Sequence, residues 1–236
     1  MSTSLLTVLV VGPTVAVVVA VFVVMWKART TPATSRTAIV AGIALGAWAV
    51  AVIVLGVRGA FIQPDGDSIP PLGIELGLAF VVLVVAFSAS ASLRSLFTNQ
   101  QHLIRLNVWR LEGIVFLVLM FNRQMPALWA LPVGIGDIAV GATAFRVANQ
   151  LATPAGRQVA VVFNLFGLAD LVVAVALGMT TNIGPLQVFH TIPTSELVTH
   201  FPLVLVPAFL VPLAFALHVI SLTQLWGGSW SQLSEA

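Results

Sequence analysis

The chain has 236 residues, of which 59% are apolar and only 8% are charged. Because a soluble domain averages roughly 25% charged residues, this composition excludes an ordinary soluble protein and predicts an integral membrane protein. The net charge of +2 comes without a basic cluster interleaved with aromatic residues, so no nucleic-acid partner is expected. The absence of cysteine excludes disulfides, thiol nucleophiles and cysteine-ligated metal centres.

Seven apolar stretches have the length of about 20 residues that a membrane-spanning helix needs. They cover residues 5–26, 38–58, 72–93, 103–121, 127–147, 158–178 and 202–226. The fourth stretch is the most diluted, by Arg105, Arg110 and Glu112. The first stretch is expected to remain in the protein, because no positively charged signal-peptide segment precedes it. The predicted fold class is all-α: a polytopic bundle of seven transmembrane helices that forms a single transmembrane domain over residues 1–236.

Lysine and arginine are unevenly distributed between the alternate connections. The connections after the first, third and fifth stretches hold seven of them: Lys27, Arg29, Arg36, Arg94, Arg105, Arg146 and Arg157. The other connections hold Arg58 and Arg123. Since basic residues concentrate on the cytoplasmic side, the N-terminus is predicted outside and the C-terminus in the cytoplasm. The predicted location is the inner (plasma) membrane, with the lipid bilayer as the main partner.

Tryptophans are predicted to form belts at the two membrane interfaces. The expected positions are Trp26, Trp109, Trp226 and Trp230 at the inner interface and Trp129 at the outer one.

Small residues and prolines predict how the helices pack. Gly42-x-x-x-Gly46 and Gly73-x-x-x-Gly77 fit the motif that lets helix backbones approach closely, which also allows a helix-mediated oligomer. Helix bends are predicted at Pro13, Pro207 and Pro212. The last helix, with two of these prolines, is expected to be the most irregular.

Four charged residues lie deep within the predicted spans: Arg110, Glu112, Asp137 and Asp170. An ionised group at the centre of a bilayer costs about 2.5–3.5 kcal/mol, so such residues face the bundle interior, pair with one another or serve a function. At a helical period, three of them align with other polar or small residues. These stripes are Asn107, Arg110 and Gly113; Ala130, Gly134, Asp137 and Gly141; Asn164, Gly167, Asp170, Ala174 and Gly178; and Ala214, His218 and Ser221.

The stripes predict one shared interior among the fourth to seventh spans, with Arg110 as the partner of Asp137, Asp170 or both. Glu112 lies two residues from Arg110 and so points away from it. Unless His218 is protonated, at least one carboxylate is left without a cation. The candidate binding residues are Arg110, Asn107, Asp137, Asn164, Asp170 and His218. This cluster is either a site for a ligand or a proton, or an inert clamp between helices, and the sequence leaves both interpretations open.

Single residues bear on three more specific classes of membrane protein: retinal proteins, intramembrane proteases and metalloproteins. Covalent retinal is excluded, because the single lysine, Lys27, lies in a predicted loop. The segment Gly134-Ile-Gly-Asp137 resembles the G-x-G-D motif of intramembrane aspartyl proteases, which implies a second catalytic aspartate, here Asp170. In that family the partner aspartate precedes the motif, whereas Asp170 follows it. No metal site is expected, because His190, Glu196 and His200 lack a tight ligand spacing.

The leading functional prediction is a small transport or proton-linked binding protein without a cofactor. Arg110 would hold a small ion or an anionic small molecule, and Asp137 and Asp170 would balance charge or carry a proton. The alternative is an intramembrane enzyme, an aspartyl-type hydrolase or a lipid-modifying enzyme, with Asp137 and Asp170 as acid and base. A third interpretation is a non-catalytic membrane partner subunit.

Overall fold

The computed structural model describes the backbone of residues 3–64 and 69–233 and the side chains as far as residue 226. Part of the predicted connection 59–71 and the Trp230 side chain therefore lie outside the described residues. Over the part that is described, the chain is all-helical and has no strand. The predicted all-α class is confirmed.

The α-helices are α1 (Thr3–Ala28), α2 (Pro32–Val57), α3 (Pro71–Ala89), α4 (Ala91–Ser95), α5 (Gln100–Arg105), α6 (Gly113–Phe121), α7 (Ala127–Gln150), α8 (Pro154–Thr181) and α9 (Val211–Leu233). Two 3₁₀ segments, η1 (Leu106–Glu112) and η2 (Glu196–Thr199), and a π-helical turn, η3 (Val206–Leu210), complete the described elements.

Six helical segments of the described chain are long and apolar enough to cross a membrane. They are Ser4–Ala28, Pro32–Val57, Pro71–Ala89, Ala127–Gln150, Pro154–Thr181 and Val206–Trp226. The fourth predicted span, 103–121, is not one regular helix, because α5, η1 and α6 follow one another there. In the 3₁₀ segment, side chains three residues apart lie in line, which places Asn107 and Arg110 on one face with Gly113.

Prolines and threonines define where several helices begin. Thr31 caps α2: its hydroxyl accepts from Thr34 N, and Thr34 Oγ1 accepts from Thr31 N. Thr153 caps α8 in the same way, accepting from Gly156 N. In both helices proline occupies the first position, where its missing N–H leaves no helical hydrogen bond unmade.

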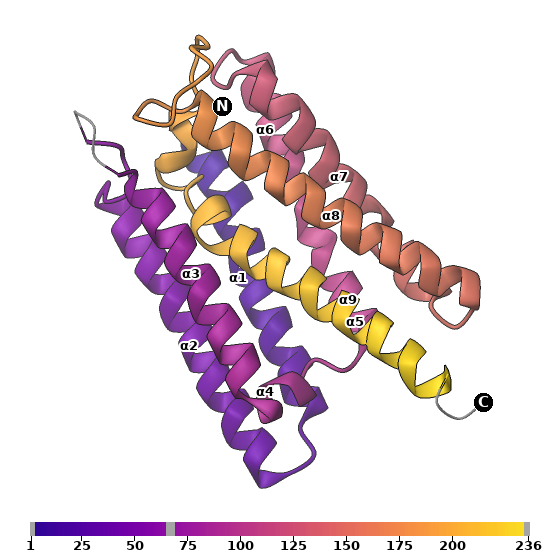
Figure 1. Ribbon diagram of the computed structural model, residues 1–236. Coiled ribbons are helices and arrows are strands. Elements are labelled where there is room, and N and C mark those ends of the chain that lie inside the picture. Colours follow the sequence, from indigo (N-terminus) through magenta and orange to yellow (C-terminus); the bar gives the residue numbers. More distant parts are fainter. Residues whose placement is uncertain (1–2, 65–68, 234–236) are drawn as a thin grey trace.

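The helices form two groups, joined through α9 and through the packing of α1 against η1 (Figure 1). On one side α1 packs against α2, and α2 and α3 contact η3. On the other side α7 packs against α8, α6 and η1, and α9 contacts α8, α5 and α3. The connections that follow α2, α6 and α8 lie at the same end of the bundle as the N-terminus (Figure 1).

The irregularity predicted for the last helix is present. The π-helical turn Val206–Leu210 contains Pro207, and α9 continues from it with Pro212 as its second residue. A proline cannot donate the helical hydrogen bond, so the ladder widens locally at this point. Pro13 and Pro132 lie inside α1 and α7, which continue through them.

The small-residue motifs of α2 and α3 do only part of what the sequence predicts. A methyl group at Gly42 would meet the Phe22 ring of α1, so this glycine is a packing position. Gly46 and Gly77 have nothing within 4 Å of such a methyl group. The close backbone contacts of the described chain are instead formed around η1, α7 and α8.

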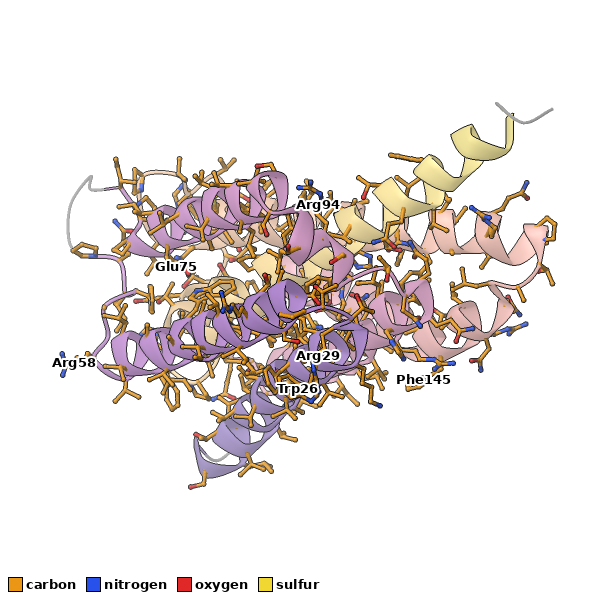
Figure 2. All side chains as sticks on the ribbon, turned by 90° about the horizontal axis from the view of Figure 1, so that it is seen from below. Trp26, Arg29, Arg58, Glu75, Arg94 and Phe145 are labelled. Atoms are coloured by element: carbon orange, nitrogen blue, oxygen red, sulfur yellow. The ribbon has the colours of Figure 1, made fainter. Side chains whose placement is uncertain are left out.

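Two of the tryptophans do not face outward as an interfacial belt would. Trp109 and Trp129 are 8% and 5% exposed and pack inside the bundle. Trp26, by contrast, is exposed at the end of α1, where the Arg29 guanidinium carbon lies 3.2 Å from its ring centroid (Figure 2).

Candidate functional site

Arg110 is the centre of the polar cluster. It lies on η1, and its side chain is completely buried. A buried guanidinium needs partners for its donors, because desolvation without compensation costs several kcal/mol. All three of its nitrogens have such partners, which come from three other helices.

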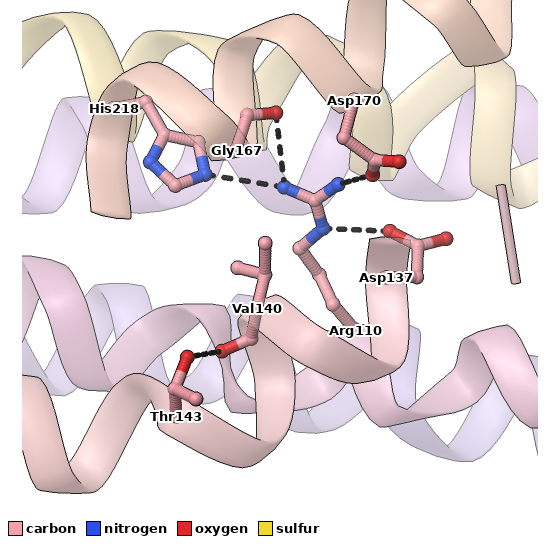
Figure 3. Close-up of polar contacts among 7 residues, drawn as sticks. All are labelled: Arg110, Asp137, Val140, Thr143, Gly167, Asp170 and His218. Atoms are coloured by element: carbon pink, nitrogen blue, oxygen red, sulfur yellow. Dashed lines mark hydrogen bonds and ion pairs between the residues drawn. The ribbon is translucent and has the colours of Figure 1, made fainter. Parts of the chain in front are cut away.

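The Arg110 partners belong to α7, α8 and α9 (Figure 3). Nε donates to Asp137 Oδ1 over 2.6 Å, and Nη2 forms the second ion pair with Asp170 Oδ2. Nη1 donates to Gly167 O over 3.3 Å and to His218 Nε2 over 3.2 Å. One side chain thus joins η1 to α7, α8 and α9.

Glycines make this arrangement sterically possible. A methyl group at Gly113, the first residue of α6, would lie 2.6 Å from Asp137 Cβ and 2.8 Å from Gly134 O, so α6 and α7 meet backbone to backbone. A methyl group at Gly136 would overlap the Asp170 carboxyl group, and one at Gly167 would overlap the His218 ring. Gly113 and Gly167, which were predicted to line the interior, and Gly136, which was not, therefore create the space that the polar side chains fill.

The network continues from His218 toward the far end of α9. Since Arg110 can only donate, His218 Nε2 accepts, which leaves the proton on Nδ1 to be donated to Asn164 Oδ1 over 2.9 Å. Asn164 Nδ2 then donates to Ser221 Oγ over 2.9 Å, and Ser221 Oγ donates to Gln100 Oε1 over 2.8 Å. Because amide groups do not readily accept and release protons, this chain fixes orientations rather than conducting protons.

Two predicted members lie outside the Arg110 network. Asn107 is buried, but its amide donates to Leu103 O over 3.1 Å within its own segment. Glu112 is buried, and neither of its carboxyl oxygens has a hydrogen-bond partner within the described chain. Asp137 and Asp170 share one cation, so Glu112 is the carboxyl group without one.

The structure therefore brings together five of the six predicted binding residues, namely Arg110, Asp137, Asp170, Asn164 and His218. Sequence reasoning missed Gln100 and Glu75. Gln100 closes the network at Ser221, and Glu75 of α3 accepts from the Trp48 indole over 3.1 Å. The position of Glu75, the fifth residue of the otherwise apolar α3, is the signal that indicates a polar contact there. For metal ligands, the residues that the structure describes contain no group of three His, Asp or Glu side chains able to hold an ion.

A cavity of about 90 Å³ adjoins the cluster. Asp137 lines it, and so do residues of α8 from Leu171 to Asn182, a distance of about 16 Å along the helix. The remaining lining is almost entirely apolar and includes Trp109, Trp129 and the π-helical turn at Val206 and Pro207. The Trp129 indole donates to Ala174 O over 3.0 Å and its ring packs edge-on against Phe116, so both contacts fix the orientation of this ring. Asp137 therefore provides the charged group of an otherwise apolar chamber.

Comparison with known proteins gives a family but no named relative. No curated protein and no solved structure matches this chain. A family model described as a domain of unknown function, DUF8737, matches residues 69–226. That segment includes α3, every member of the Arg110 network and all residues that line the cavity. Since the match covers more than half of the sequence, the chain belongs to the DUF8737 family.

Proposed function

We propose that this protein is a multi-pass membrane protein that binds a small, mostly apolar molecule in the cavity beside Asp137. One observation carries the proposal: Asp137 belongs to the Arg110 network and also lines the cavity. Apolar walls favour an apolar body, and a buried carboxylate favours a cationic or hydrogen-bond-donating group on the ligand. The π-helical turn in the opposite wall supports the proposal, since such turns occur frequently at functional sites.

The proposal includes seven spans, with α5, η1 and α6 as the fourth. At about 1.5 Å per α-helical and 2.0 Å per 3₁₀ residue, residues 100–121 reach roughly 36 Å, enough for a hydrocarbon core of about 30 Å. The orientation keeps the N-terminus outside and the C-terminus in the cytoplasm of the plasma membrane. Its support is that Lys27, Arg29, Arg94, Arg146 and Arg157 lie at or near the helix ends opposite the N-terminus.

The protein would be a transporter if the bound ligand also crosses the membrane. An anionic ligand held by Arg110 is the competing possibility, and it requires Asp137 or Asp170 to leave the guanidinium. An enzyme of the aspartyl type would need its two acids to share a proton, whereas here both aspartates bind Arg110. A cationic or donor ligand at Asp137 requires neither rearrangement.

The test uses three photoreactive probes with the same diazirine-bearing alkyl chain and an amine, an alcohol or a carboxylate at its end. Protein in lipid nanodiscs is irradiated with each probe, and the labelled peptides are identified by mass spectrometry. We expect the amine to label residues 129–137 and 171–182 most strongly. Preferential labelling of these segments by the carboxylate would support the anionic ligand instead.

A matched pair of variants on α8 keeps this test specific. Val175→Phe fills the cavity without touching the Arg110 network, whereas Val172, which is 57% exposed, does not line it. We expect Val175→Phe to abolish labelling of the cavity segments and Val172→Phe to preserve it. Unchanged labelling of the cavity segments in Val175→Phe would contradict the proposal. Uptake of the radiolabelled amine into proteoliposomes distinguishes transport from binding alone. Uptake that Val175→Phe abolishes would indicate transport through this cavity.

A further inference from the structure

A second hollow lies on the outside of the bundle, between α1 and the surface formed by α5, η1 and α7. This groove has a volume of about 430 Å³. Its α1 wall is a single stripe of Pro13, Ala16, Val17, Ala20 and Val24, which runs about 16 Å along the helix. Ala16 and Phe145 are exposed, so the groove opens at the surface. The small side chains of Ala16 and Ala20 leave room for a chain-like apolar occupant.

One end of the groove is basic. His102 and Arg105 of α5 line it there, and Arg105 Nη2 donates to Asn149 Oδ1 over 2.8 Å. Asn149 is uncharged, and within the described residues both ion pairs belong to Arg110. The buried Nε of Arg105 also lacks a hydrogen-bond partner in that part of the chain. Arg105 therefore carries a positive charge, and a free donor, without an anionic partner.

This basic end lies at the level where lipid headgroups would be. Asn149 is one residue from the end of α7, and Val24 is four residues from the end of α1. Trp26, near the end of α1, and Arg29, which follows the helix, lie at this end as well (Figure 2). The groove thus runs from a cation near the end of the bundle into its apolar middle.

We infer that the groove binds an anionic phospholipid, with one acyl chain along α1 and the phosphate on Arg105. The apolar stripe suits a hydrocarbon chain, and a guanidinium without an anionic partner suits a phosphate. Basic sites between helices on the cytoplasmic side are typical positions for such headgroups. The inference rests on the proposed insertion into a membrane, but it does not depend on the central cavity.

The experiment uses nanodiscs of equimolar phosphatidylcholine and phosphatidylglycerol, followed by native mass spectrometry of the released protein. We expect the wild type to retain phosphatidylglycerol preferentially. Arg105→Gln should lower the ratio of retained phosphatidylglycerol to phosphatidylcholine about fivefold, the effect of one basic residue near an anionic membrane. Arg146→Gln, at an exposed position that does not line the groove, should leave the ratio unchanged.

A second pair of variants tests the acyl-chain wall. Ala20→Phe fills the groove, whereas Val19 is 55% exposed and does not line it. We expect Ala20→Phe to remove retained lipid and Val19→Phe to preserve it. Equal retention of the two lipids by the wild type, or an unchanged ratio in Arg105→Gln, would overturn the inference. The inference would also be overturned if chemical cross-linking trapped a dimer of the wild type but not of Ala20→Phe, since a second protein copy would then cover the groove. Failure to enter nanodiscs at all would contradict the membrane proposal instead.

Discussion

The helices α1–α3 and the segment from η1 to α9 are equally helical but differ in what they bury. Of the window of α3 that is apolar enough to span, 6% is buried, compared with 67% for Val206–Trp226. In α1–α3 the buried polar side chains are Thr14 and Thr34. From η1 to α9 the buried set includes an arginine, three carboxylates and a histidine.

This difference teaches where the specificity of the fold lies. In the membrane that we propose, apolar side chains gain little by exchanging one hydrocarbon contact for another, so α1–α3 can leave theirs exposed. Polar groups have no such freedom, because each buried donor or charge requires a particular partner. The unique arrangement of this protein is therefore set mainly by the second region, and most of that region lies within the family match.

The largest expected effect comes from removing the cation of the second region. Arg110→Met leaves Asp137 and Asp170 buried without it, so we expect a loss of about 3–5 kcal/mol in the free energy of unfolding. Unfolding of the detergent-solubilised protein, followed by circular dichroism, measures this. The triple variant Arg110→Met, Asp137→Asn, Asp170→Asn should recover part of the loss. Wild-type stability in Arg110→Met would show that the network does not hold the helices together.

A medium effect is expected from one substitution made in both regions. Gly113→Ala forces the backbones of α6 and α7 apart and should cost about 1–3 kcal/mol in unfolding free energy. Gly46→Ala meets nothing within 4 Å and gains helix propensity, so it should be neutral or stabilising by up to about 1 kcal/mol. Equal thermal stability of the two variants would remove the contrast between the regions.

The smallest expected effect concerns the first region, where Trp48 of α2 donates to Glu75 of α3. Trp48→Phe removes the hydrogen bond to Glu75 and should cost about 1 kcal/mol in unfolding free energy, while the smaller phenyl ring can still pack on Phe209. In a Glu75→Gln background the amide oxygen still accepts, so Trp48→Phe should cost a similar amount. In a Glu75→Leu background the cost should fall. A cost that is the same in all three backgrounds would assign it to packing rather than to the hydrogen bond.

The sequence predicted the ion pairs of Arg110 because charge and small residues together constrain where these side chains can lie. Arg110, Asp137 and Asp170 each lie on a stripe with glycine, and only a shared interior satisfies all three. The 3₁₀ segment was not predictable, since residues three apart, such as Asn107 and Arg110, share a face in an α-helix as well as in a 3₁₀-helix. The cavity was also not predictable, because it depends on how Val206 and Pro207 of the π-helical turn face α8.

The spread of the Arg110 partners along the chain has a consequence for assembly. Asp137 follows Arg110 by 27 residues, Asp170 by 60 and His218 by 108. During synthesis the partners of Arg110 therefore become available one after another, first Asp137 on α7, then Asp170 on α8, and finally His218 on α9. The contact between Arg110 and His218 can form only when α9 has been made, so the last helix completes the network.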